Sequence, residues 1–377
     1  MNADFLLIIG VFEALFLGIL VLSKRKKQIS DILLATILWL NALTIFFSWI
    51  EIYNRSNGYP FPALINGSTP FILLHGPLLW IYVKSLTCEN FRLKTIHLTH
   101  IVPFLLVALL IGLSTYGLPA GKRIIIDSEQ LFKEHWSYPV IVSAIFISIQ
   151  SYIIHSFIHI HRYRRKIKSF FSTIDQFNLK WLRFVLSTAM AFYGIISLTY
   201  IFDFFLNILP YQLLQITGFT IASIYILVLG FFGLHQGNIF SSHSIHSLPE
   251  EEEKQKHLGP LESAEERFIE QLLQHMKQNQ PHLEPELNLA QLSSHLSVSP
   301  EYLSGILNNK LNSNFFDFIN QYRIDSFKNQ CREKEKQNLT LLGIAYECGF
   351  NSKATFNRVF KKRTGLTPGE FARQVSE

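Results

Sequence analysis

The sequence predicts an all-α protein, in which a seven-helix transmembrane bundle is followed by a cytoplasmic domain of two helix–turn–helix units joined by a linking helix. Two observations lead to this fold class. Residues up to about 234 form long apolar runs, whereas the chain from 235 onward is polar and charged. In that polar part, the same succession of features occurs twice: a short helix, a turn, a capping serine and a second helix with an apolar stripe. We therefore expect two parts that fold in different solvents.

Composition limits the class of protein further. Of the 377 residues, 49% are hydrophobic and only 16% are charged, against about 25% charged residues in typical soluble proteins. The three cysteines, Cys88, Cys331 and Cys348, form no CxxC pair. This pattern suits a reducing compartment and excludes a disulfide framework. We expect no zinc site and no cofactor.

Seven apolar runs approach the length of about 20 residues that is needed to cross a bilayer. The third run is the weakest, because Asn66, Pro70, His75 and Pro77 interrupt it. The first run is not a cleaved signal peptide, since no basic residue precedes it and a basic cluster follows it. The predicted spans are residues 5–22, 32–50, 63–83, 101–116, 138–157, 184–206 and 213–234.

Lysine and arginine residues gather in alternate loops, after the first, third and fifth spans. Cytoplasmic loops carry such an excess of positive charge. The amino terminus is therefore expected outside, and seven spans place the polar part (residues 236–377) in the cytoplasm. With only six spans and the carboxy terminus still in the cytoplasm, the basic cluster at residues 24–27 would face outward, against this rule.

Polar residues inside spans are costly and are therefore candidates for function. The candidates for contact with a signal or ligand are Glu13, Asn41, His75 and Asp203. The alternative is that they form hydrogen bonds between helices. The sequence names no ligand.

Histidines near the fifth span raise the question of a membrane enzyme. His155 and His159 have a spacing that can place two imidazoles on one helix face, as metal sites do. Membrane di-iron hydroxylases, however, carry several histidine boxes with adjacent pairs, and this chain has no such pair. We expect no metal site, and an enzyme is the least supported alternative.

After the spans (residues 1–235), residues 236–262 form a polar linker with an acidic run, and a helical pattern resumes at residue 263. In the first helix–turn–helix unit, a short helix ends near Leu296 and Ser299 suits an N-cap before Pro300. Leu303 and Ile306 lie on the buried stripe of the helix that follows. Residues 314–332 then predict one long linking helix.

The pattern repeats 53 residues later. Gly349 suits the left-handed position that ends a helix, and Ser352 can cap the next one. Phe356 and Val359 match Leu303 and Ile306 of the first unit. From residue 351 to 369 the chain has five basic residues and no acidic one, so one helix presents a strongly positive face.

These motifs resemble the AraC family of bacterial transcription regulators. The resemblance covers residues 263–374 and is carried by "GF" at 349–350, "F…VF" at 356–360, Gly365, "TP" at 367–368 and "FFDFINQYRI" in the linking helix. It implies a cytoplasmic DNA-binding domain and a bacterial cytoplasmic membrane. Two departures are Phe327, where the family has a small Ala, and Gly305, where many members carry a long polar side chain that reads bases. The first affects packing and the second weakens base readout by the first unit.

The resemblance also assigns expected DNA contacts. Arg358 is the best base or phosphate contact, because arginine binds guanine bidentately. Serine and threonine hydroxyls at the helix starts would bind phosphates, and two recognition helices about 34 Å apart would enter successive major grooves. The expected contacts are Ser299, Tyr302, Ser304, Asn308, Ser352, Lys353, Ala354, Thr355, Asn357, Arg358 and Lys361.

The prediction is therefore a membrane-anchored, sequence-specific DNA-binding transcription regulator whose transmembrane half senses a signal. The alternative is a membrane tether or interaction protein with no signal response of its own. The expected partners are double-stranded DNA, the lipid bilayer and an unknown ligand or membrane partner. The sequence leaves open whether the chain acts as a monomer or a homodimer, and whether it activates or represses.

Overall fold

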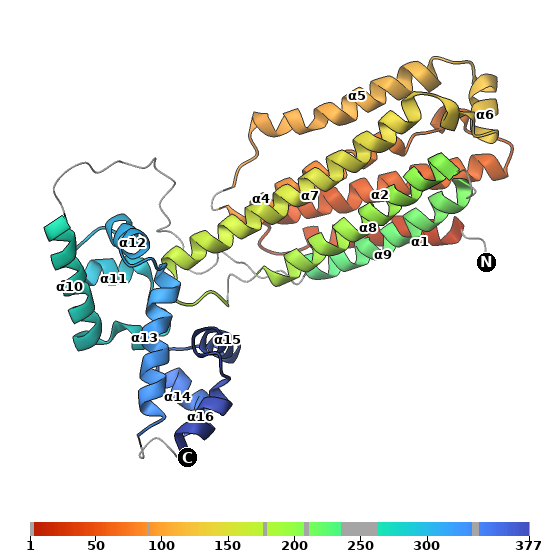
Figure 1. Ribbon diagram of the computed structural model, residues 1–377. Helices are drawn as coiled ribbons and strands as arrows, with labels where there is room; N and C mark the ends of the chain where they lie inside the picture. Colours follow the sequence, from red (N-terminus) through yellow and green to blue (C-terminus); the bar gives the residue numbers. More distant parts are fainter. Residues whose placement is uncertain are drawn as a thin grey trace. The chain divides into compact units, whose positions relative to one another are not determined.

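The computed structural model describes residues 4–88, 91–175, 179–206, 211–234, 262–333 and 339–376 (Figure 1). In these residues the regular structure is helical, with one isolated antiparallel bridge between Phe171 and Asn288. The all-α prediction is confirmed. The chain divides into two compact units, one from Met1–His161 and Leu179–Asn238, the other from Arg162–Asn178 and Ile239–Glu377.

Seven segments are long and apolar enough to cross a membrane, as predicted. Five of them are continuous helices, and the third and fourth are broken. In the third, Asn66 adopts a left-handed backbone (φ 61°) and Pro70 lies in the first turn of a new helix, where a missing N–H is tolerated. The continuous helices are α1 (Asp4–Leu22), α2 (Ile29–Ser56), α7 (Ser137–Phe170), α8 (Lys180–Leu206) and α9 (Tyr211–Leu234); the broken spans consist of η1 (Pro62–Leu64), α3 (Thr69–Ile72) and α4 (His75–Thr87), and of η2 (Thr95–Ile101), α5 (Val102–Ile111) and η3 (Gly112–Tyr116).

The first unit exposes large apolar side chains and buries several polar side chains within its apolar core. Large side chains such as Phe12, Leu113 and Phe205 are 66%, 72% and 75% exposed. Buried positions include Thr44, Ser48 and other polar side chains of α2. Such an exposed apolar surface suits a lipid environment, where apolar side chains need no shielding from water.

A helix that the sequence did not predict, α6 (Ala120–Ser128), lies between the fourth and fifth spans and is followed by η4 (Leu131–Glu134). Asp127 of α6 accepts hydrogen bonds from Arg55 at 2.7 and 2.8 Å. Lys133 of η4 pairs with Asp203 at 2.7 Å. Basic residues of this loop and of α2 thus neutralise two buried carboxylates.

The second unit contains both predicted helix–turn–helix pairs, with the long helix α13 between them (Figure 1). The predicted helix boundaries agree within about two residues, as is usual for helix ends. The predicted linker, residues 236–262, lies outside the described residues up to 261. The helices are α10 (Glu262–Asn279), η7 (Pro281–Leu283), α11 (Leu289–His295), α12 (Pro300–Asn309), α13 (Phe315–Gln330), α14 (Leu341–Glu347), α15 (Lys353–Thr364) and α16 (Pro368–Ser376).

Each helix–turn–helix pair has its own apolar core on α13. In the first, Leu303, Ile306 and Leu307 pack with side chains of α10 and α11. In the second, Phe327 lies 4.8 Å from Phe356 and 5.3 Å from Phe360, measured between ring centroids. Phe327 is fully buried, so the large ring at this position is accommodated by an aromatic core.

The connection between α7 and α8 also belongs to the second unit, which the sequence did not indicate. Residues 171–175, here called the strap, run beside the segment that precedes α11. Phe171 forms the bridge with Asn288, and the Ser172 N–H donates to the Leu287 carbonyl oxygen at 3.4 Å. The DNA-binding half predicted from residue 263 onward is therefore packed against a segment almost 90 residues earlier in the chain.

Gly349 connects α14 to the turn of the second pair with a left-handed backbone, φ 89°. A Cβ here would collide with the carbonyl oxygen of His282 and lie 2.9 Å from that of Leu283. We predict that Gly349→Ala destabilises the second unit by about 2 kcal/mol or more, because it adds backbone strain to the collision. Labelling of the buried Cys348 thiol, in a chain with Cys88 and Cys331 replaced by serine, should become roughly 30-fold faster.

Gly305→Ala is the matched control. No atom lies within 4 Å of a Cβ built at Gly305, and alanine is favoured over glycine inside a helix by about 1 kcal/mol. Cys348 should label no faster in this variant. Equal labelling rates for Gly349→Ala and the unchanged chain would contradict the packing described.

Candidate functional site

The helix that follows the turn in each pair begins at a serine cap. Ser299 Oγ accepts a hydrogen bond from the Tyr302 N–H at 3.2 Å, and Ser352 Oγ accepts one from the Thr355 N–H at 3.3 Å. Both caps were predicted from sequence and are confirmed. Capping fixes where α12 and α15 begin, and therefore which side chains each helix turns outward.

The outward face of α15 is basic. Phe356, Val359 and Phe360 are buried in the core. Lys362 and Arg363 turn toward α13, where their nitrogens lie 3.5 and 3.8 Å from Asp317. The exposed face that remains carries Lys353, Ala354, Asn357, Arg358 and Lys361, all of which the sequence predicted as contacts.

The corresponding face of α12 is less charged. Asn308 is exposed and donates to Ser304 Oγ at 3.2 Å. The Tyr302 ring packs edge-on against Phe268 at 5.0 Å and is half-buried. Gly305 leaves an open surface between them. Ser304 and Asn308 therefore lie together on one side of α12, whereas the Tyr302 ring turns toward the core, and the exposed surface of this helix is small and polar.

Thr355 departs from the expectation that it faces a phosphate. It is only 3% exposed, and its hydroxyl lies 2.7 and 2.6 Å from the two carboxylate oxygens of Asp175 in the strap. A hydroxyl has one proton, so it donates to one of these oxygens at a time. Arg358 Nη2 in turn donates to Thr355 Oγ1 at 3.2 Å.

Arg323, in the middle of α13, is fully buried. Its Nε donates to the His282 carbonyl oxygen at 2.8 Å, and Nη2 donates to the Glu284 carbonyl oxygen at 2.7 Å. The strap supplies two further acceptors, Ser172 Oγ at 3.1 Å and Thr173 Oγ1 at 3.5 Å. Burial lowers the pKa of Arg323 to about 10, so the guanidinium remains charged at neutral pH.

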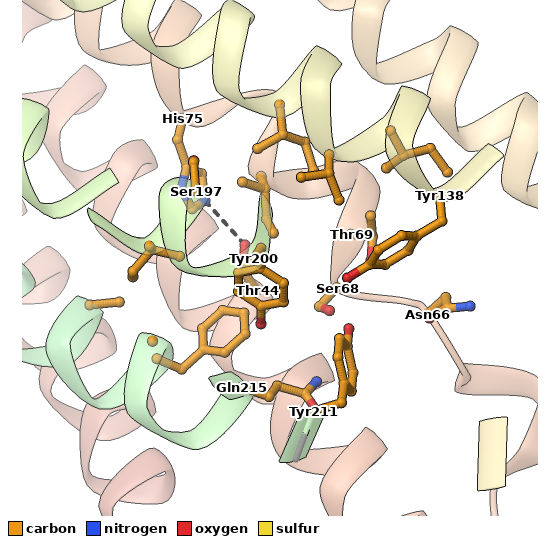
Figure 2. A pocket seen from close by; sticks show the side chains of 18 of the residues that line it. Thr44, Asn66, Ser68, Thr69, His75, Tyr138, Ser197, Tyr200, Tyr211 and Gln215 are labelled. Atoms are coloured by element: carbon orange, nitrogen blue, oxygen red, sulfur yellow. Dashed lines mark hydrogen bonds between the residues drawn. The ribbon is translucent and has the colours of Figure 1, made fainter. Parts of the chain in front are cut away.

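The first unit contains a cavity of about 180 Å³ between α2, α3, α4, α7, α8 and α9 (Figure 2). The tyrosine hydroxyls of Tyr138 and Tyr211 point into the same space as Ser68 (Figure 2). No Asp, Glu, Lys or Arg side chain is among its described lining residues. The polar lining residues are Asn41, Thr44, Asn66, Ser68, Thr69, His75, Ser114, Thr115, Ser137, Tyr138, Tyr193, Ser197, Tyr200, Tyr211 and Gln215.

Two of the four predicted signal residues line this cavity. They are Asn41 and His75, and the His75 ring nitrogens lie 3.2 Å from Thr44 Oγ1 and 2.9 Å from Tyr193 Oη. Glu13 is half-buried on α1 and does not line the cavity. Asp203 is held by Lys133.

The buried carboxylate of Glu51 was not among the residues predicted from the sequence. It accepts hydrogen bonds from the Ser68 N–H and hydroxyl, at 3.0 and 2.9 Å, and from Gln215 Nε2 at 2.6 Å. Gln215 also accepts from Arg55 at 2.7 Å and lines the cavity. Glu51 follows the predicted end of the second span by one residue, so it counted as a loop residue; its helical spacing from Arg55 was the available signal.

Metal ligation finds no support in the described part of the chain, where no three His, Cys, Asp or Glu side chains gather closely enough to share an ion. The histidines of the fifth span have other partners. His155 Nδ1 lies 2.7 Å from the Ser151 carbonyl oxygen, and His159 Nε2 lies 2.7 Å from Thr87 Oγ1.

Comparison with known proteins relates the second unit to transcription regulators. A family model described as "Helix-turn-helix domain" matches residues 292–374. The chain is 30% identical over 91 residues to YtdP, an uncharacterized HTH-type transcriptional regulator of Bacillus subtilis, covering 24% of this chain and 11% of YtdP. It is 32% identical over 80 residues to YesN, an uncharacterized transcriptional regulatory protein of the same bacterium, covering 21% of each.

A third relative is an uncharacterized HTH-type transcriptional regulator of Staphylococcus aureus, 32% identical over 90 residues, or 24% of this chain and 12% of the relative. The chain thus covers about a fifth or less of the length of these relatives. No solved structure matches the chain.

His282 should make the second unit sensitive to acid. It is 4% exposed, and burial beside Arg323 lowers its pKa from 6.5 to about 4. Between these pH values the unfolded chain binds a proton here and the folded chain does not. We predict that the free energy of unfolding falls as the pH falls through this window, by at most about 1.4 kcal/mol per pH unit.

The measurement is urea-dependent exposure of the Cys348 thiol at several pH values between about 4 and 7, with a reagent that reacts in acid. His282→Gln should reduce the slope of the free energy of unfolding against pH, because glutamine does not titrate. An unchanged slope in this variant would show that His282 does not carry the dependence.

Proposed function

Because the carboxy-terminal part of the chain carries a helix–turn–helix domain of the AraC type, we propose that the protein is a membrane-anchored, sequence-specific DNA-binding transcription regulator. The observation that carries this proposal is the exposed basic face of α15 within a duplicated helix–turn–helix arrangement. Such a helix can place side chains in a major groove while its start and its neighbours contact phosphates.

Readout of sequence rests mainly on α15. Arg358 and Asn357 are exposed there, and their side chains suit guanine and adenine edges respectively. Lys353 and Lys361 add phosphate contacts, which give affinity without sequence preference. The small, polar face of α12, with Gly305 at its centre, contributes less to specificity.

The apolar outer surface of the first unit supports anchoring in a bilayer. Basic loops after the first, third and fifth spans support an orientation with the amino terminus outside and the DNA-binding domain in the cytoplasm. The cytoplasmic membrane of a bacterium is the compartment in which such a domain meets DNA.

The cavity of the first unit supports a sensing role. A cavity of about 150 Å³ accommodates benzene, so 180 Å³ admits an uncharged molecule with a ring-sized apolar body. Hydroxyl, amide and imidazole groups of the lining would bind the polar groups of that molecule. A charged ligand would find no opposite charge among the described lining residues.

A tether that binds DNA without responding to a signal is the second candidate. It shares the basic face of α15 but gives the cavity no role. Transcription that responds to a cavity ligand separates the regulator from the tether.

Arg358→Ala tests the DNA-binding proposal. We expect the full chain in lipid nanodiscs to select particular genomic fragments, and the variant to bind them with affinity lower by about 1–3 kcal/mol and with relaxed specificity. Lys362→Ala removes a charge from the same helix, but Lys362 faces Asp317, so its effect should be smaller and equal for all fragments. Weak, unselective binding by the unchanged chain would contradict the proposal.

Gly218→Leu tests the sensing proposal. Gly218 lines the cavity, and a Cβ there meets only Ile196 at an ordinary 3.5 Å, so leucine should fill the space. The tryptophans all lie in the first unit, so their fluorescence reports its thermal unfolding. Uncharged ring compounds that raise the unfolding temperature of the unchanged chain should not raise that of Gly218→Leu.

The matched control is Gly121→Leu on α6, where a Cβ meets no atom within 4 Å and the cavity is not touched. Compounds should stabilise this variant as they stabilise the unchanged chain. Equal stabilisation of Gly218→Leu would place the binding site elsewhere.

A further inference from the structure

We propose that the strap, residues 171–175, is a latch on the recognition helix α15, in which the Asp175 carboxylate occupies the position of a DNA phosphate. The latch and DNA would then compete for α15. The inference rests on the proposed function, because it concerns how DNA reaches this helix.

The first part of the strap is an anchor. Ser172 is fully buried. Its hydroxyl donates to the Leu287 carbonyl oxygen at 2.5 Å, and its carbonyl oxygen accepts from Asn320 Nδ2 at 2.9 Å. Arg323 donates to the hydroxyls of Ser172 and Thr173. Removing these residues would leave buried donors without acceptors, which is costly, so the anchor stays in place.

The last described residue of the strap is held differently. Among the described residues, Asp175 is bound by one hydroxyl, that of Thr355, with oxygen–oxygen distances of 2.6 and 2.7 Å. Thr355 lies in the first turn of α15, three residues after the Ser352 cap. The start of a helix is where proteins commonly bind phosphate groups. A carboxylate and a phosphate use the same donors and carry like charge, so both cannot occupy this place.

Arg358 connects the latch to base readout. Its Nη2 donates to Thr355 Oγ1 at 3.2 Å, the same oxygen that binds Asp175. While the latch is closed, this arginine is drawn back along α15 and lies close to a carboxylate. DNA must release Arg358 and bring its own negative charge beside Asp175, which like charges oppose. A closed latch therefore lowers the affinity of α15 for DNA.

The latch is close in sequence to the cavity. Asp175 precedes Lys180, the first residue of α8, by five residues, a reach of at most roughly 18 Å when extended. Helix α8 contributes Tyr193, Ser197 and Tyr200 to the cavity lining. Chain connectivity therefore links the latch to a helix that lines the cavity.

The test compares two substitutions that change charge equally. In the full chain in nanodiscs, Asp175→Asn should bind a selected DNA fragment about tenfold more tightly, because the neutral amide no longer excludes phosphate. Asp325→Asn removes the same charge from an exposed position of α13, where the carboxylate accepts a hydrogen bond from Gln321 of the same helix. This control should change the affinity less than about twofold.

A double-mutant cycle separates the contact from general charge. Thr355→Val keeps the side-chain shape and removes the hydroxyl that holds Asp175. In the Thr355→Val background, Asp175→Asn should raise the affinity for DNA by no more than the Asp325→Asn control does. A gain that is the same with and without the Thr355 hydroxyl would overturn the latch.

The remaining outcomes are also decisive. Equal affinities for Asp175→Asn, Asp325→Asn and the unchanged chain, with selective binding intact, would overturn the latch and leave the proposed function standing. Absence of selective binding in every variant would overturn the proposed function, and the latch with it.

Discussion

The buried guanidinium of Arg323 is the interaction on which the second unit depends. Its donors are satisfied by backbone carbonyl oxygens of the segment that begins at η7 and by two hydroxyls of the strap. A buried charge without such acceptors would cost several kcal/mol. The Nε atom of Arg323 also lies 3.0 Å from the position that a Cβ of residue 349 would take, so Gly349 packs directly against this guanidinium. One side chain therefore fixes η7, the strap and the turn of the second helix–turn–helix pair around α13.

This arrangement explains how two small helix pairs become one DNA-reading surface. A pair of short helices buries too little apolar surface to be stable alone. Each pair instead completes a core on α13, one aliphatic around Leu303 and one aromatic around Phe327. Because α13 is a single helix, the spacing of α12 and α15 is set by its length. The strap, which follows α7 in the chain, is part of this same unit.

Much of the second unit could be predicted from its sequence, because the signals are local. Ser299 and Ser352 are caps whose partners lie three residues away, and the buried stripe of each helix follows from its period. The burial of Thr355 could not be predicted, since its partner Asp175 is 180 residues away and no local pattern couples them. The strap itself lies in the connection between the fifth and sixth predicted spans, and its five residues carry no pattern that indicates packing.

In the first unit, apolar length and loop charge predicted seven spans, but not which polar side chains lie buried between them. Asn41 and His75 were recognisable because each interrupts an apolar run, and both line the cavity. Glu51 and Gln215 lie near span ends, where polar residues are common, and the helical spacing of Glu51 from Arg55 was the one local signal. The pairing of Asp127 with Arg55 required α6, whose amphipathic stretch is too short to stand out.

The most direct test of the central claim is a hydroxyl-radical footprint of the full chain in nanodiscs on a selected genomic fragment. Two helix–turn–helix pairs held by α13 should protect two patches on one face of the DNA, about one helical turn or roughly 10 base pairs apart. A single protected patch, or protection spread evenly along the fragment, would contradict the account.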